Sequence, residues 1–116
     1  MNVERETGPS QPVILLGASN LTMSFPLILE NLSACLPKPV SVFAALGHGR
    51  SFGNWSRVLY RRLPGILDCG LWNEWAKHRD QFLPPKLLLT DIGNDLVYGV
   101  SVTDIMSWIE SCLERG

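Results

Sequence analysis

Three short apolar runs constrain the fold of this chain more than any other feature. They span residues 12–19 (PVILLGAS), 39–47 (PVSVFAALG) and 86–93 (KLLLTDIG). Each run is uniformly apolar or rich in β-branched residues, has a proline at or just before its start, and ends at a glycine or a polar turn. Runs of this kind are typical of central strands in a parallel sheet, which are buried on both faces. We therefore expect three parallel strands.

The segments between the runs carry the spacing of amphipathic helices. Helices are expected over residues 22–36, 52–63 and 71–82, and a last helix follows Ser101 and Thr103, either of which could cap it. The expected apolar face of the second helix consists of Trp55, Val58, Leu59 and Leu63. Strands that alternate with helices predict an α/β layer fold with parallel crossovers.

The length and composition indicate one domain and disfavour some classes of binding partner. The 116 residues fit one domain, which we place at 13–116 after a polar, flexible lead at 1–12. A formal net charge of -1 gives no reason to expect nucleic acid or an anionic membrane as a partner. No stretch has the length of a membrane span, and the start lacks the pattern of a secretory signal. A cytoplasmic location is therefore expected.

The cysteines and glycines give no sign of a metal or a cofactor. Cys35, Cys69 and Cys112 are far apart, without a CxxC pair or a Cys/His cluster, so we expect reduced and mostly buried thiols. Neither GxGxxG after the first run nor a Walker A sequence is present, which disfavours nucleotide binding. No metal and no cofactor are predicted.

Polar residues follow all three runs, where open α/β sheets bind their ligands. We call the residues at the carboxyl end of each run a tip. The first tip, GASN, places Ser19 at a strand-to-helix turn, beside the small residues Gly17 and Ala18. Backbone N–H groups and the helix dipole favour developing negative charge at such a position. The alternative is that Ser19 or Asn20 only caps the helix that follows.

The second and third tips offer groups that could act on the same ligand. In GHGRSFG, Gly47 or Gly49 could donate a backbone N–H to an oxyanion, or could serve a turn that needs positive φ. His48 could act as a general base, although a hydrogen-bonded loop residue is the simpler interpretation. In DIGND, the Asn94 amide could reach that oxyanion while Asp95 accepts backbone N–H bonds, or the pair could form an ordinary Asx turn.

Two further sets of side chains leave alternatives open. A local basic cluster could be a solvated helix face or a site for an anionic substrate; its members are Arg50, Arg57, Arg61 and Arg62. The four tryptophans could stack on a ligand, but their helical spacing favours packing in the core; they are Trp55, Trp72, Trp75 and Trp108.

Taken together, the three tips resemble the SGNH or GDSL family of serine ester hydrolases. The resemblance implies a flavodoxin-like three-layer α/β/α fold with strand order 2-1-3-4-5, and the hydrolysis of carboxylic ester or acetyl groups in a small-molecule substrate. It assigns the nucleophile to Ser19 and the oxyanion amide to Asn94. It assigns the oxyanion glycine to Gly49, with Gly47 as the competing choice. It covers residues 13–113.

The sequence departs from the family pattern at three places. Ala18 stands where the family has an aspartate before the serine. Gly93 directly precedes Asn94, so the Gly-x-Asn-Asp spacing is shifted by one, with Ile92 at the usual glycine. The late Asp-x-x-His motif that supplies the base is absent, and neither histidine, His48 or His78, lies in such a motif.

The missing motif leads to two alternative expectations. One is a truncated hydrolase domain of about three strands with little or no activity of its own, because an unassisted serine hydroxyl is a poor nucleophile. In that interpretation, a histidine beyond Gly116 would serve as the base. The other is a non-catalytic, flavodoxin-like binding module. It would associate, with itself or with a partner, through the open edge of its incomplete sheet.

Overall fold

The computed structural model describes residues 11–36, 39–58, 61–81 and 83–116. The main sheet has three parallel strands, β1 (Gln11–Leu16), β2 (Val40–Ala45) and β5 (Lys86–Leu89), in the order β2-β1-β5. The protein is therefore an α/β protein with a parallel sheet, as expected. The second, first and third parallel strands lie in the order expected for the start of a flavodoxin-like sheet.

The central strand β1 is buried on both faces, as its continuous apolar sequence predicts. Ile14 and Leu16 belong to one core cluster, and Val13 and Leu15 to another. Successive side chains of a strand point to opposite faces, so these two pairs face opposite layers of helices.

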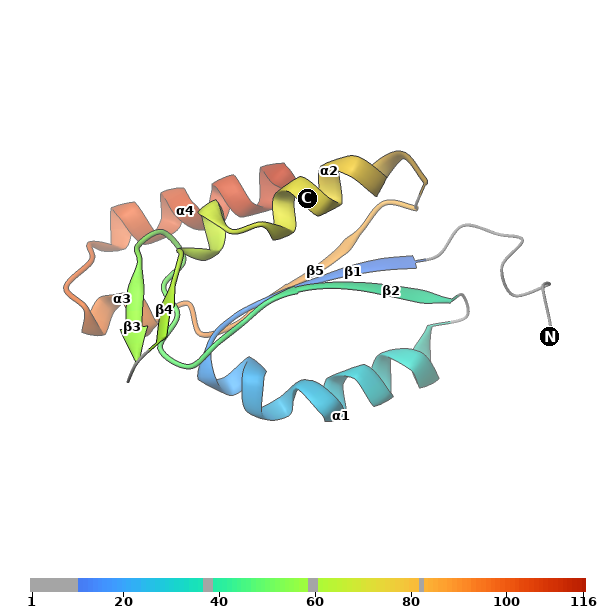
Figure 1. The fold of residues 1–116 in the computed structure, drawn as a ribbon, viewed down its shortest axis with the longest axis horizontal. Coiled ribbons are helices and arrows are strands. Elements are labelled where there is room, and N and C mark those ends of the chain that lie inside the picture. Colours follow the sequence, from blue (N-terminus) through green and yellow to red (C-terminus); the bar gives the residue numbers. More distant parts are fainter. Residues whose placement is uncertain (1–10, 37–38, 59–60, 82) are drawn as a thin grey trace.

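Helix α1 (Ser19–Cys35) covers one face of the sheet (Figure 1). Its Leu21 packs with Val13 and Leu15. The apolar residues that surround this cluster are partly buried: Phe25, Ile28, Leu32, Leu36, Val40 and Leu46. The spacing of three and four from Phe25 to Leu36 is the pattern on which the sequence prediction depends.

Helices α2 (Leu71–His78) and α4 (Val102–Arg115) cover the other face, so the molecule has three layers (Figure 1). The shorter helices are η2 (Ile66–Asp68), η3 (Arg79–Gln81) and α3 (Asn94–Val97). Ser101 caps α4 by accepting the N–H of Asp104 at 3.1 Å, so Ser101 rather than Thr103 is the cap. The main core cluster lies in this layer: Ile14, Leu16, Ala45, Phe52, Ile66, Trp72, Trp75 and Cys112.

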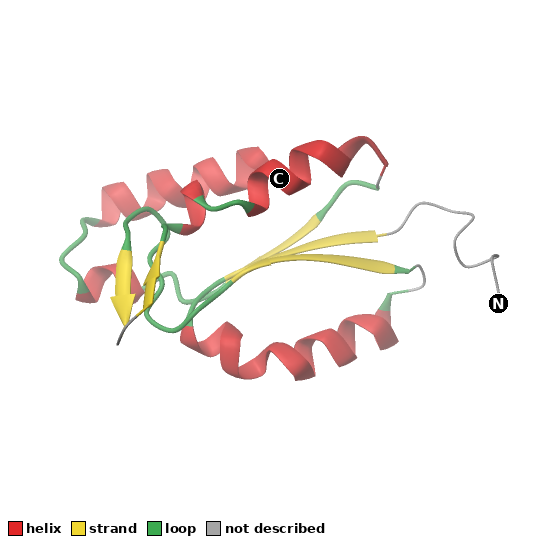
Figure 2. Ribbon diagram, in the orientation of Figure 1, coloured by secondary structure: helices red, strands yellow, loops and turns green. Residues whose placement is uncertain are grey.

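The helix predicted over residues 52–63 is wrong. The described part of this segment forms two short antiparallel strands, β3 (Ser56–Val58) and β4 (Arg61–Leu63), drawn as the separate pair of arrows in Figure 2. Position 59, part of the expected apolar face, lies outside the described residues.

Contacts between distant residues explain this difference. The N–H of Ile66 donates to the carbonyl of Ser51 at 3.0 Å, which joins the two ends of the segment. At the same place Gly65 lies against Gly53, because a Cβ on Gly65 would lie 2.5 Å from the Gly53 carbonyl carbon. A straight helix would hold the ends of this segment apart, so tertiary pairing overrides the helical spacing.

Some boundaries and burial predictions also need correction. Strand β1 begins at Gln11, inside the segment expected to be a flexible lead, and the rest of that lead lies outside the described residues. Cys35 is exposed and only Cys112 of the three free thiols is buried, where burial raises its pKa to about 11. Trp55 is 63% exposed, unlike the three tryptophans that pack in the core layer.

Candidate active site

The three tips lie at one end of the sheet, where the loops that follow β1, β2 and β5 run together (Figure 2). Two backbone bonds align the ends of the strands. The N–H of Gly17 donates to the carbonyl of Ala45 at 3.0 Å, and the N–H of Thr90 donates to the carbonyl of Leu16 at 2.8 Å. The residues after the three strands therefore start from the same edge.

Ser19 is the first residue of α1, and its side chain does not cap the helix. The N-cap is Ala18, which cannot supply a side-chain cap. Asp91, from the third tip, takes that role: Oδ2 accepts from the N–H groups of Ala18 (2.7 Å) and Leu21 (3.3 Å), and Oδ1 accepts from the N–H (3.3 Å) and side-chain amide (2.8 Å) of Asn20. The alternative in which Ser19 or Asn20 caps the helix is therefore wrong.

Asp91 is held in an unusual conformation by these bonds. Its φ is 59°, in the left-handed region that few residues other than glycine adopt, and Thr90 Oγ1 donates to its Oδ2 at 2.8 Å. Burial alone would raise the pKa of Asp91. The hydrogen bonds from Ala18, Thr90, Asn20 and Leu21 outweigh burial and lower the pKa below its usual value. Asp91 is thus an ionised cap at the positive end of α1.

The second tip contains the turn with positive φ that its glycines predict. Gly47 has a φ of 150° and Gly49 a φ of 70°. The hydroxyl of Tyr98, just after α3, donates to the carbonyl of Gly49 at 2.9 Å. This bond joins the second tip to the third.

Asp95 joins the same two tips from the interior. Its side chain is fully buried, and Oδ2 accepts the N–H of Phe52 at 3.1 Å. Asp95 therefore holds a loop by accepting a backbone N–H, as expected, but the loop is the second tip rather than its own. The side chain of Asn94 forms no hydrogen bond with a described residue, so the expected alternative of an Asx turn does not form.

The polar groups at the three tips that have no hydrogen-bond partner among the described residues include the Oγ and N–H of Ser19, the N–H of Gly49 and the side-chain amide of Asn94. All three residues are half-buried. A hydroxyl together with N–H donors is the set of groups that acyl transfer uses, since the donors stabilise the negative oxygen that forms. That Ser19, Gly49 and Asn94 converge on one ligand stays a prediction.

Neither histidine of the chain contacts the predicted nucleophile. His48 is exposed next to Gly49 and forms no hydrogen bond within the described residues, so its expected role as a hydrogen-bonded loop residue is not seen. His78 lies on α2, with Nε2 3.7 Å from Glu74 Oε2. Within the described ranges, no three His, Cys, Asp or Glu side chains gather as a metal site. No helix there has the length and apolarity to cross a membrane.

The basic cluster divides into a buried and an exposed part. Arg50 is buried, with Nε donating to the carbonyl of Pro64 (3.0 Å) and Nη1 to that of Leu46 (3.1 Å), and burial lowers its pKa. Arg50 therefore supports the second tip and is not part of a solvated face. Arg57 and Arg62 are exposed on the β3–β4 hairpin.

The sequence gives no reason to single out Asp91 or Tyr98, although both lie in the stretch TDIGNDLVYG that carries Asn94. The one available signal for Asp91 is its position directly after a buried strand, where polar residues reach the neighbouring tips.

No family model, curated protein or solved structure matches this chain.

Proposed function

We propose that this chain carries the nucleophile and the oxyanion hole of an SGNH-type serine ester hydrolase that acts on carboxylic ester or acetyl groups. One observation carries the proposal. In the third tip, Asp91 accepts from the N–H of Ala18, next to Ser19, and the Tyr98 hydroxyl donates to the carbonyl of Gly49. The Ser19 hydroxyl, the N–H groups of Ser19 and Gly49 and the Asn94 amide have no partner among the described residues. Ser19, Gly49 and Asn94 therefore keep hydrogen-bonding groups that a ligand could engage.

In the proposed reaction, Ser19 Oγ attacks the carbonyl carbon of the ester and loses its proton to a base. The carbonyl electron pair moves onto its oxygen, which accepts hydrogen bonds from the N–H groups of Ser19 and Gly49 and from the Asn94 amide. The intermediate collapses, the alcohol leaves with a proton, and water then releases the acid from acyl-Ser19. Asp91 occupies the N–H groups of Ala18, Asn20 and Leu21, so the N–H of Ser19 stays available to the substrate.

The lack of a general base beside Ser19 limits the rate of the proposed reaction. General base assistance contributes on the order of 10²–10⁴-fold, and neither His48 nor His78 forms a hydrogen bond with Ser19. We therefore expect slow reaction of Ser19 with an electrophile. Imidazole added to the solution supplies a base that can enter from the half-exposed side of Ser19, so it should accelerate the reaction.

A fluorophosphonate probe tests the proposal, because Ser19 Oγ displaces fluoride from phosphorus and keeps the probe. Intact-mass spectrometry of the full chain should find one adduct, formed faster with 100 mM-scale imidazole and absent in Ser19→Ala. Ser24→Ala, an exposed serine on the same helix, is the matched control and should label normally. Asn94→Ala should slow labelling by about 10²-fold, the usual effect of losing one oxyanion donor. Labelling that persists in Ser19→Ala, or no labelling with imidazole, would overturn the proposal.

A second candidate function is association through the sheet edge, and one observation favours it. Within the described residues β5 pairs only with β1, and its Leu88 is 41% exposed. An unpaired strand edge is a template for another strand. Light scattering after size exclusion should then find a mass that rises with concentration, and Leu88→Lys should abolish the rise. A monomer at every concentration would exclude this candidate.

A further inference from the structure

A pocket of about 200 Å³ adjoins the second and third tips. Its lining consists of Ser51, Asn54, Trp55, Ser56, Arg57 and Tyr98. Ser51 follows the GHGR turn directly, and the Tyr98 hydroxyl is bonded to the carbonyl of Gly49. The pocket is thus connected to the predicted oxyanion glycine by one side chain and by a short stretch of backbone.

The lining is rich in hydrogen-bond donors and contains no carboxylate. The Oγ of Ser56 is buried and has no hydrogen-bond partner among the described residues. The Oγ of Ser51 accepts from the N–H groups of Gly53 (3.2 Å) and Asn54 (3.0 Å), so its own hydrogen remains available to donate. A buried hydroxyl without a partner destabilises the protein, and a ligand that accepts a hydrogen bond from it would offset that cost.

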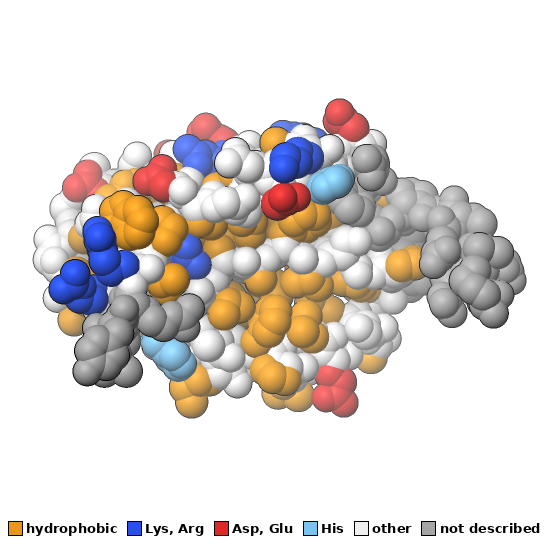
Figure 3. Space-filling view, in the orientation of Figure 1, with side chains coloured by type: hydrophobic (Ala, Val, Ile, Leu, Met, Phe, Trp, Pro, Cys, Tyr) orange, Lys and Arg blue, Asp and Glu red, His pale blue; other side chains and the backbone are white. Residues whose placement is uncertain are grey.

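Two arginines face each other beside this pocket. Arg57 lies directly opposite Arg62 in the register of β3 and β4, and like charges in such a pair destabilise the hairpin. The Arg62 guanidinium lies 5.0 Å from the centre of the Trp55 ring. Neither arginine forms an ion pair with a described residue. Figure 3 shows basic side chains gathered at the end of the molecule that carries β3 and β4.

From these observations we infer that the pocket binds an anionic group, a carboxylate or a phosphate, of the substrate; this inference rests on the proposed function. The anion accepts hydrogen bonds from Arg57 and from the Ser51 and Ser56 hydroxyls. It also relieves the repulsion between the two arginines, and the exposed Trp55 ring covers its apolar part. The substrate class is therefore a small ester that carries a negative charge outside the scissile group.

Binding can be measured without any chemistry at Ser19. We would titrate the ¹⁵N-labelled full chain with inorganic phosphate and, separately, with succinate, and follow the Trp55 indole and Ser56 amide signals. Saturable shifts are expected in the wild type, about 10-fold weaker binding in Arg57→Gln, and weaker binding in Arg62→Gln. The ligand with the tighter saturation identifies phosphate or carboxylate as the natural anion.

Arg79→Gln is the matched control. Arg79 is also an exposed arginine over a tryptophan, 6.0 Å from the Trp75 ring centre, but it begins η3, directly after α2. Figure 1 shows α2 separate from β3 and β4. Arg79→Gln should leave both titrations unchanged. The inference is overturned if neither anion gives saturable shifts, or if Arg79→Gln weakens binding as much as Arg57→Gln, which would indicate an effect of net charge alone.

The outcome is separable from that of the hydrolase proposal. Ser19→Ala should bind the anions as the wild type does, because it lacks only the nucleophile. Anion binding without Ser19 labelling would support the anion site and contradict the hydrolase proposal. Ser19 labelling without anion binding would support the hydrolase proposal and contradict the anion site.

Discussion

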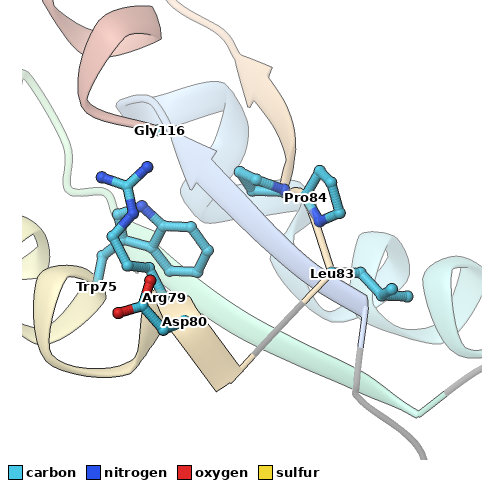
Figure 4. Close-up of a pocket in the computed structure, with 7 residues that line it drawn as sticks. Trp75, Arg79, Asp80, Leu83, Pro84 and Gly116 are labelled. Atoms are coloured by element: carbon cyan, nitrogen blue, oxygen red, sulfur yellow. The ribbon is translucent and has the colours of Figure 1, made fainter.

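The two ends of the parallel sheet are built differently. At the carboxyl end, side chains tie the three tips through polar bonds: Asp91 to the start of α1, Asp95 to Phe52 and Tyr98 to Gly49. At the amino end, a cavity of about 480 Å³ lies beside the start of β5 (Figure 4). Its lining combines apolar side chains with one basic and one acidic residue: Trp75, Leu83, Pro84, Pro85, Arg79, Asp80 and Gly116.

The difference indicates that different interactions stabilise the two ends of the sheet. Burial of large side chains such as Trp75 holds the amino end, where Gln11 adds hydrogen bonds from its N–H to the carbonyl of Pro39 (2.8 Å) and from Nε2 to the carbonyl of Pro84 (3.0 Å). The carboxyl end is held by directional hydrogen bonds that leave specific donors unused. Substitutions at the amino end should therefore change stability, and those at the carboxyl end should change the chemistry more than the stability.

The largest effect is expected from Trp75→Ala at the amino end. Trp75 is buried and packs edge-on against Phe43, with ring centroids 5.3 Å apart, so its removal should destabilise the fold by about 3–5 kcal/mol. Urea unfolding followed by circular dichroism measures the loss. Trp55→Ala, at an exposed position, should lose less than about 1 kcal/mol. Equal losses in the two variants would contradict the role assigned to the amino end.

Asp91→Ala should have the next largest effect, about 1–2 kcal/mol, because it removes the cap of α1. The pKa of Asp91 is lowered in the folded protein, so its carboxylate stabilises the fold above the unfolded pKa of about 3.9. That stabilisation is lost as pH falls through the folded pKa.

Urea midpoints at a series of pH values test this dependence. The difference between wild type and Asp91→Ala should be full at neutral pH and should shrink in acid. Asp80→Asn, at an exposed aspartate, is the control and should follow the wild type at every pH. A difference that does not change with pH would show that the charge of Asp91 does not stabilise the fold.

Gly49→Ala should cost about 1–2 kcal/mol, because an alanine at a φ of 70° is strained. The strain would also displace the Gly49 N–H and slow the labelling of Ser19. Gly93→Ala is the matched control at the carboxyl end: its φ is -73° and a Cβ there would meet nothing within 4 Å. Similar labelling rates in the two variants would exclude Gly49 as an oxyanion donor and favour Gly47.

The smallest change in stability is expected from Tyr98→Phe, which removes one exposed hydrogen bond worth about 0.5–1 kcal/mol. The labelling rate of Ser19 should nevertheless fall, because the carbonyl of Gly49 loses its tie to the third tip. Unfolding and labelling measured on the same sample separate the two effects. A variant with normal labelling would show that this bond does not position Gly49.

Local signals in the sequence account for most of the fold. The three parallel strands and the helices over 19–35, 71–78 and 102–115 all follow from continuous apolar runs or from regular spacing. The hairpin at 56–63 does not, because bonds from residues 66 and 67 to residues 51 and 52 decide its shape. Apolar spacing carries no information about such distant partners.

The candidate site divides in the same way. Position after a predicted strand makes Ser19, Asn94 and either Gly47 or Gly49 candidates, and the family resemblance alone favours Gly49. The cap from Asp91 cannot be predicted in this way, because a helix start is normally interpreted from the residues beside it, and here the carboxylate comes from the third tip. The contact of Tyr98 with Gly49 likewise depends on how α3 lies against the second tip.

The bond from Asp91 to Ala18 spans 73 positions of the chain, and it has a consequence for synthesis. A ribosome that has made only the first strand and α1 has produced the serine, but the start of that helix still lacks its carboxylate. The start of α1 can therefore gain its cap only after the end of β5 has emerged. Because such a contact is non-local, its closure is expected to be slow and to come late as the polypeptide grows.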